Sequence, residues 1–120
     1  VLIDVLEGNL PDDFDVICTS LFLHHLVDET AAALLGKMSA AARPLVLVND
    51  LIRETRGLLL AHLASHLFTS SDVVRTDAPL SVRAAFTLAE MRAFAARAGL
   101  QGSTLSRRWP CRFLFAWTKQ

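Results

Sequence analysis

Two runs of apolar residues, each followed by polar residues, predict two neighbouring strands of a parallel sheet. The first run is Phe14 to Thr19 and the second is Leu45 to Val48. Continuous apolar character favours central strands that are covered on both faces. Ligand sites of open parallel sheets lie beyond the carboxyl ends of the strands. We therefore expect the polar residues that end the two runs to share one rim: Thr19, Ser20, His24, His25, Asn49 and Asp50.

Apolar residues at helical spacing predict a helix on each side of the second strand. The first helix runs from Asp28, its predicted N-cap, through Arg43, and Pro44 ends it. Its apolar face comprises Ala31, Leu34, Leu35, Met38 and Ala42. Gly36 lies inside this helix and weakens it by about 1 kcal/mol relative to alanine. The second helix is rich in leucine and runs from Glu54 to Phe68.

The third predicted helix begins after Thr87 and ends at Gly99. Thr87 and Glu90 have the spacing of a capping box, and Gly99 suits the C′ position. Residues 69–80 precede this helix, are largely polar and contain Pro79, so they are predicted to form a loop. Residues 103–108 and 111–118 have the alternation of strands and are joined by a short connection, which predicts a terminal antiparallel hairpin.

Together these elements predict an α/β fold. A strand, a helix and a second strand form a right-handed unit of a mostly parallel sheet, to which the last two strands add an antiparallel hairpin. The length of 120 residues suits one domain or part of one. The opening residues, Val1 to Asp4, have the character of the end of a strand, so we expect N-terminal strands of the domain to precede them.

Composition and charge argue against several classes of protein. The formal net charge is +0, and Arg107 with Arg108 is the only basic doublet, so neither nucleic acid nor an anionic membrane is an expected partner. No apolar run reaches the roughly 18 residues of a membrane span. Cys18 and Cys111 lie in apolar runs and are predicted to be small core side chains without a disulfide, as in a cytoplasmic protein.

The order of several short motifs resembles that of class I S-adenosylmethionine-dependent methyltransferases. The motifs are Asp4-Val5-Leu6, Phe14-Asp15-Val16-Ile17, Leu23-His24-His25-Leu26, Pro44 to Asp50, Phe86-Thr87 with Glu90-Met91, and Ala98-Gly99-Leu100. The resemblance covers nearly the whole chain and is closest to the small-molecule branch that includes ubiquinone and menaquinone biosynthesis enzymes. It implies a Rossmann-like methyltransferase sheet whose final strand is antiparallel.

The resemblance also implies S-adenosylmethionine as the cofactor and a small molecule as the methyl acceptor. Asp4 matches the position that accepts a hydrogen bond from the adenine amino group, and Val5 would pack near the ring. Thr19, Ser20 and Leu21 would line the floor beneath the methionine part. The family's Gly-rich turn, and the acidic residue that ends its second strand, have no counterpart in the sequence.

His24 and His25 are the candidate catalytic residues. Methyl transfer is a direct displacement, so the enzyme mainly supplies proximity and alignment. A neutral imidazole can in addition accept the proton of a hydroxyl acceptor. Adjacent histidines in a helix or turn point in different directions, so only one of them is expected to face the substrate. Local packing or capping is the alternative role for either residue.

Four residues are candidates for substrate binding. Asn49 and Asp50 could orient the substrate or hydrogen-bond the neighbouring loop. Arg53 and Arg83 could contact an acidic group of the substrate, although arginines are common on surfaces. Residues 52–80 are expected to form a helical, lid-like insertion within the single domain of residues 1–120, with an apolar pocket shaped by residues 58–68.

His62 and His66 have the i, i+4 spacing of a metal site, but we predict no metal there. No third ligand occurs at suitable spacing, and Leu63 stands where the metalloprotease motif has glutamate. The two histidines are instead expected at the edge of an amphipathic helix.

Two functions remain open from the sequence. The first is an S-adenosylmethionine-dependent methyltransferase acting on a small molecule, and a homo-oligomer is compatible with it. The second is a non-catalytic domain of the same fold that acts as a binding or partner subunit. A different nucleotide-binding α/β protein is less favoured, because no phosphate-binding loop is present.

Overall fold

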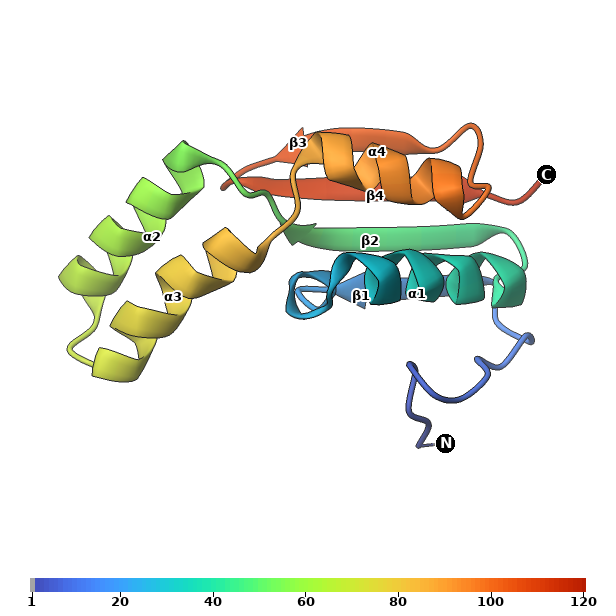
Figure 1. Ribbon diagram of the computed structural model, residues 1–120, viewed down its shortest axis with the longest axis horizontal. Helices are drawn as coiled ribbons and strands as arrows, with labels where there is room; N and C mark the ends of the chain where they lie inside the picture. The colour runs from blue at the N-terminus through green and yellow to red at the C-terminus, as the bar shows by residue number, and fades with distance from the viewer. Residues whose placement is uncertain (1) are drawn as a thin grey trace.

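The computed structural model describes residues 2–120, which form a sheet and its covering helices (Figure 1). In chain order the elements are β1 (Val16–Ser20), the short 3-10 helix η1 (Leu23–His25), α1 (Asp28–Ala41), β2 (Leu45–Leu51), α2 (Thr55–Phe68), α3 (Asp72–Ala84), α4 (Leu88–Arg97), β3 (Thr104–Arg108) and β4 (Arg112–Thr118). Val1, the first residue of the strand end expected from the sequence, lies outside the described residues. Leu2 to Asp4 form no strand.

The four described strands have the order β1-β2-β4-β3. β1 and β2 are parallel, whereas β4 is antiparallel to both β2 and β3. The predicted α/β sheet with a C-terminal antiparallel hairpin is therefore confirmed. Because β4 runs against β2, its first residues lie beside the last residues of β2, and Arg112 is the partner of Leu51.

Helices α1 and α4 cover one face of the sheet (Figure 1). The apolar face predicted for α1 is buried, and so is Met91 of α4; Leu35, Met38 and Met91 are each at most 1% exposed. They pack in one cluster with Phe113 and Phe115 of β4. Burial alternates along β2. The residues that point away from α1 and α4 are only partly buried. The hydrophobic core thus lies on one side of the sheet.

The position of β1 differs from the prediction of a central strand covered on both faces. Among the described residues β1 is an edge strand paired only with β2. Its residues alternate between exposed and half-buried, and Val16 is 47% exposed. Cys18 is exposed as well, so the prediction that it is a core side chain was wrong. An apolar run alone does not distinguish a covered strand from an edge strand.

The ends of α4 follow the capping signals in the sequence. The Thr87 hydroxyl accepts a hydrogen bond from the Glu90 backbone, and the Glu90 carboxylate accepts one from the Thr87 backbone. At the other end Gly99 has a φ of 75°, and the N–H groups of Gly99 and Leu100 bond back to Ala96 and Ala95. These bonds form a Schellman motif, which satisfies carbonyls at the helix end.

The start of α1 corrects another prediction. Val27, rather than Asp28, occupies the N-cap position, and Asp28 lies in the first turn. An acidic side chain there still interacts favourably with the helix dipole. The helix ends at Ala41, two residues before the predicted end.

Helix α3 replaces most of the loop predicted over residues 69–80. The Ser71 hydroxyl caps its first turn by accepting a hydrogen bond from Val74, and Pro79 lies inside the helix. Proline in a helix interior removes one backbone hydrogen bond and costs about 3 kcal/mol. Pro79 and Val82 are buried, and Arg75 hydrogen-bonds the carbonyls of His66 and Thr69 at the end of α2. Packing against α2 therefore offsets the cost of the proline.

Helices α2 and α3 lie side by side and project from one end of the sheet (Figure 1). This projection gives the molecule a length of 45 Å. A Cβ at Gly57 would lie 3.2 Å from Cys111 Cβ, so glycine permits the close approach of α2 to the start of β4. None of the helices described, over residues 2–120, is both long and apolar enough to cross a bilayer.

Candidate active site

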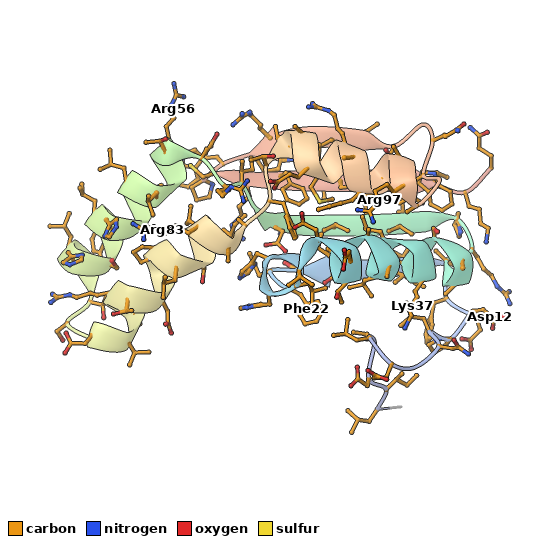
Figure 2. The ribbon with its side chains drawn as sticks, in the orientation of Figure 1. Asp12, Phe22, Lys37, Arg56, Arg83 and Arg97 are labelled. Carbon is orange, nitrogen blue, oxygen red and sulfur yellow. The ribbon has the colours of Figure 1, made fainter. Side chains whose placement is uncertain are left out.

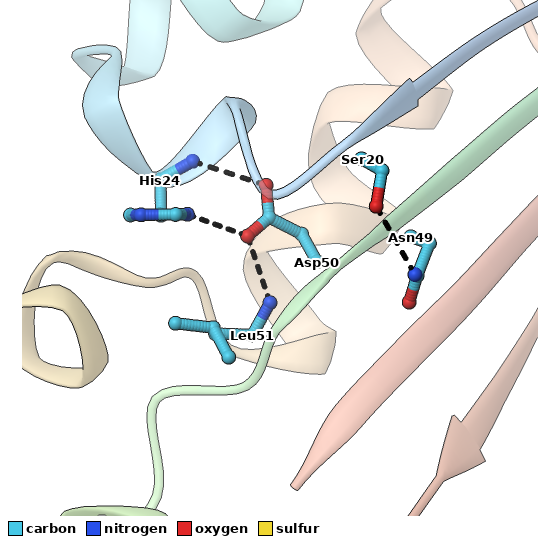
Figure 3. Close-up of polar contacts among 5 residues, drawn as sticks. All are labelled: Ser20, His24, Asn49, Asp50 and Leu51. Carbon is cyan, nitrogen blue, oxygen red and sulfur yellow. Dashed lines mark hydrogen bonds and ion pairs between the residues drawn. The ribbon is translucent and has the colours of Figure 1, made fainter. Parts of the chain in front are cut away.

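Polar residues at the carboxyl ends of β1 and β2 lie together, as the sequence predicted (Figure 3). The Asn49 side-chain amide donates a hydrogen bond of 3.3 Å to the Ser20 hydroxyl. The Leu21 backbone N–H donates one of 2.9 Å to the Asn49 carbonyl. These bonds hold the end of β1 against β2 and direct the following chain into η1.

His24 and Asp50 form a buried pair on this rim (Figure 3). The His24 Nδ1 lies 2.6 Å from Asp50 Oδ1, and the His24 backbone N–H donates to Asp50 Oδ2 at 3.2 Å. The Leu51 backbone N–H also donates to Oδ1, at 2.8 Å. The exposed fractions are 7% for His24 and 1% for Asp50. Hydrogen bonds to both carboxylate oxygens therefore fix the position of Asp50 and, through it, of the imidazole.

This geometry fixes the tautomer of His24. An ionised carboxylate only accepts hydrogen bonds, so Nδ1 carries the proton that lies between the two side chains. The second ring nitrogen, Nε2, lies at the end of the imidazole away from Asp50 (Figure 3). In the neutral ring Nε2 has a lone pair and can accept a proton, and the carboxylate stabilises the imidazolium that results.

A cavity of about 440 Å³ adjoins the His24–Asp50 pair. This volume falls within the roughly 300–1,000 Å³ typical of small-molecule sites. Its walls come from the end of β1, η1, the end of β2, the start of β4, and helices α2 and α3. The lining residues are Leu21, His24, His25, Leu51, Ala61, Ala78, Ser81, Val82 and Arg112. A second cavity of about 320 Å³ lies beside the same two histidines, with Asp77 in its wall.

Both histidines line these cavities. Their ring centroids are 4.1 Å apart, with 38° between the ring planes. His25 is exposed, whereas His24 is buried and hydrogen-bonded to Asp50. The tight 3-10 turn of η1 brings the two rings together, and only His24 has a carboxylate partner that fixes its orientation.

The two candidate arginines lie outside this site. Arg53 is exposed and forms an ion pair of 2.5 Å with Glu90. Arg83 is exposed on α3 (Figure 2). Neither arginine lines the cavity next to His24. The Asn49 side-chain amide hydrogen-bonds Ser20, the last residue of β1.

The residues proposed to bind a cofactor divide between two places. Val5 and Thr19 line a separate cavity of about 250 Å³ between β1 and α1, together with Phe22. Leu21 instead lines the cavity of His24. Asp4 is exposed, and its Oδ1 accepts hydrogen bonds from the backbone of Leu6 and Glu7. Ser20 is the hydrogen-bond acceptor of Asn49.

His62 and His66 are exposed on α2, and His66 Nδ1 lies 2.8 Å from the carbonyl oxygen of His62. Within residues 2–120 no three side chains of the types that bind metals come together. Both histidines therefore lie at a solvent-exposed edge of the helix.

Two features of the site were missing from the sequence prediction. One is the direct bond between His24 and Asp50, which lie 26 positions apart in the chain. The other is Arg112, whose place beside Leu51 depends on the antiparallel register of β4. The alternation of apolar residues from Cys111 to Trp117 did indicate a strand, and pairing that strand with β2 would have brought Arg112 to the rim.

Comparison with known proteins agrees with this architecture. No family model matches the sequence, and no curated protein matches it. Solved methyltransferase structures do match. The chain has a methyltransferase fold.

A candidate O-methyltransferase from Nostoc punctiforme matches 99% of the chain with 22% identity and a TM-score of 0.65. Human N-acetylserotonin methyltransferase, in complex with S-adenosylmethionine, matches 97% with 19% identity and a TM-score of 0.67. Magnesium protoporphyrin IX methyltransferase from Synechocystis, with bound S-adenosylhomocysteine, matches 98% with 17% identity and a TM-score of 0.59. The chain spans 36%, 32% and 49% of the lengths of these three proteins, respectively.

Proposed function

We propose that this chain is part of an S-adenosylmethionine-dependent methyltransferase that methylates a small-molecule acceptor. The observation that carries the proposal is the buried His24–Asp50 pair beside a cavity of about 440 Å³, at the rim where an α/β sheet binds ligands. The neighbours' names support the reaction type. The likeness of the motifs to ubiquinone and menaquinone biosynthesis enzymes supports the small-molecule branch.

In this proposal His24 is the general base and Asp50 positions it. An acceptor hydroxyl in the cavity would give its proton to His24 Nε2 while its oxygen forms a bond to the methyl carbon. The bond between that carbon and the cofactor's sulfur would break, and its electron pair would stay on the sulfur of S-adenosylhomocysteine. Asp50 would stabilise the imidazolium through Nδ1. Proton transfer to a positioned side chain contributes about 10²–10⁴-fold to a rate. Leu51, Val82 and the α2–α3 pair would exclude water from the reacting groups.

The cavity lined by Val5, Thr19 and Phe22 would hold the adenine end of the cofactor. Thr19 would then lie near the purine ring and not beneath the methionine part, where the resemblance placed it. The cavity's volume of about 250 Å³ is below the usual range of whole-ligand sites, and most of its lining is apolar, which suits a purine ring. Asp4 lies next in sequence to Val5. Its Oδ1 accepts from the backbone of Leu6 and Glu7, so Oδ2 would be the oxygen that accepts from the adenine amino group. Bound S-adenosylmethionine would supply a methyl group on a positively charged sulfur.

The decisive experiment measures cofactor binding and methyl transfer separately. Calorimetric titration of S-adenosylmethionine and S-adenosylhomocysteine would be made on this chain and on the product of its full open reading frame. Transfer of a radiolabelled methyl group would be followed with catechol and protocatechuate as probe acceptors. His24→Gln is expected to lower kcat by about 10²–10⁴-fold without weakening cofactor binding.

Asp50→Asn tests the positioning role. It is expected to lower kcat by about 10–100-fold, because the amide still hydrogen-bonds the ring but no longer stabilises its charge. His62→Gln on the exposed side of α2 is the matched control and should retain full activity. Binding of the cofactor without any methyl transfer would favour the non-catalytic binding or partner domain. Binding to the longer protein alone would still support the methyltransferase proposal, and only the failure of both proteins to bind the cofactor would refute it.

A further inference from the structure

Arg112 lines the cavity of His24 and carries one side-chain nitrogen without a hydrogen-bond partner in the described part of the chain. Its Nε is buried and has no hydrogen-bond partner among residues 2–120. Two carboxylates of the neighbouring elements are already engaged, because Glu54 binds Arg107 at 2.6 Å and Asp50 binds His24. A buried donor without a partner costs about 1–3 kcal/mol, and more when it is charged. The arrangement therefore favours a ligand that brings an acceptor atom to Arg112.

The register of the sheet brings Arg112 and His24 to the same cavity. Arg112 is the first residue of β4 and pairs with Leu51 on β2, the residue that follows Asp50. Arg112, Leu51 and His24 all line the cavity of about 440 Å³. One small molecule can therefore contact both the guanidinium and the imidazole.

The surrounding charges also favour an anion. Arg108 lies directly opposite Arg112 in the pairing of β3 with β4, and like charges at opposed positions destabilise a sheet. An anion bound at Arg112 would offset that repulsion. Asp77 lines the adjoining cavity, but it is exposed, so water and salt screen its charge.

We infer that Arg112 binds a carboxylate of the methyl acceptor, so that the acceptor is a hydroxylated organic acid with its hydroxyl group at His24. The planar guanidinium matches a carboxylate with two parallel hydrogen bonds. The identity of this ligand as the methyl acceptor rests on the proposed function. The methionine part of the cofactor also carries a carboxylate, and the experiment must therefore separate the two sources.

The test compares acids with their uncharged amides. Hydroxybenzoate, protocatechuate and caffeate, each beside its carboxamide, would be titrated calorimetrically into the wild-type protein and the variants. The acids should bind the wild type about 10–100-fold more tightly than the amides, as expected for a charge-assisted pair. Arg112→Met should remove this preference while leaving the affinity for the amides unchanged, and Arg112→Lys should restore part of it. Arg97→Met is the control, since Arg97 is exposed on α4 away from the cavity (Figure 2).

Two further measurements distinguish binding of the acceptor from a structural role of Arg112 and from binding of the cofactor. Arg112→Met should melt at the same or a higher temperature than the wild type, because it removes an unsatisfied buried donor, whereas a structural role requires a lower melting temperature. Its affinity for S-adenosylmethionine should be unchanged, and a selective loss of cofactor affinity would overturn the inference. Equal binding of acids and amides by the wild type, or no binding of any acid, would overturn it too. Acid binding with the expected preference but no methyl transfer would reject the proposed function and leave the Arg112 site standing.

Discussion

The backbone N–H of Leu21 donates a hydrogen bond to the carbonyl of Asn49, and Leu21 adopts a φ of 53° as it does so. For residues other than glycine, this left-handed backbone conformation costs about 1 kcal/mol or more. The bond continues the pairing of β1 with β2 by one residue, and the chain then turns into η1. Backbone strain at Leu21 is therefore coupled to the placement of His24.

Replacement of Leu21 measures that strain. Leu21→Gly should be more stable than Leu21→Ala by about 1 kcal/mol, because both lose the side chain and only alanine retains the penalty for positive φ. The same pair at Ala93, an exposed position inside α4, should show the opposite sign, with glycine about 1 kcal/mol less stable. Urea unfolding gives both differences. Equal stability of the two Leu21 variants would show that the conformation is not strained.

Two glycines with open space around them should respond oppositely to alanine. A Cβ at Gly36 or at Gly99 would meet no atom within 4 Å, so neither substitution causes a clash. Gly36→Ala, inside α1, should stabilise the protein by about 0.5–1 kcal/mol. Gly99→Ala should destabilise it by about 1 kcal/mol, because φ is 75° at the end of α4. Thermal unfolding of the two variants would contradict this account if both shifted in one direction.

The buried pair of His24 and Asp50 should be coupled more strongly than an exposed pair of equal length. A double-mutant cycle with alanine should give a coupling free energy of about 1–3 kcal/mol. The matched control is Arg107 and Glu54, also separated by 2.6 Å but with side chains 63% and 22% exposed. Solvent should limit its coupling to about 0–1 kcal/mol. Equal coupling in the two cycles would contradict the importance of burial at the site.

The two cysteines should differ in reactivity. Burial raises the pKa of the Cys111 thiol, and the nearby Glu54 carboxylate raises it further. Cys18 is exposed on the edge strand. Iodoacetamide at neutral pH should therefore alkylate Cys18 first, and Cys18→Ser should remove the fast phase seen by mass spectrometry. Faster labelling of Cys111 would contradict this assignment.

The raised pKa of Cys111 also makes the free energy of unfolding depend on pH. The folded state holds the thiol proton more tightly than the unfolded state does. The contribution of this group to the free energy of unfolding is therefore complete below the unfolded pKa and decreases as the pH rises through the folded pKa. Cys111→Ala should remove that alkaline decrease.

The sequence predicted the parts of the fold whose signals are local. Three such signals need information from only a few neighbouring residues. They are the capping box of Thr87 and Glu90, the C′ glycine at Gly99, and the spacing of apolar residues on α1 and α4. Helix α3 was not predicted, because a proline such as Pro79 normally interrupts a helix. Its cost is offset by packing against α2, which is a tertiary effect.

The sequence predicted the region of the candidate site, but not the contacts between its side chains. Parallel strands bring their carboxyl ends to one edge, so Ser20, Asn49 and Asp50 could be placed on one rim from the order of the elements. The bond from His24 to Asp50 depends on the tight turn at η1 and on the left-handed residue Leu21 before it. Arg112 depends on the pairing of strands far apart in the sequence, which hydrophobic periodicity does not determine.

The walls of the His24 cavity come from residues 21, 24, 25, 51, 61, 78, 81, 82 and 112, and they meet only when the chain is folded. A ligand that fills this space binds the native state and has no site on the unfolded chain. By mass action, a ligand at 100 times its dissociation constant raises the free energy of unfolding by about 2.7 kcal/mol. Because α2 and α3 project from the sheet, their amide protons are the ones whose exchange with solvent should slow most when the space is filled. Occupancy of the cavity would thus make the projecting helices and the sheet unfold as one cooperative unit.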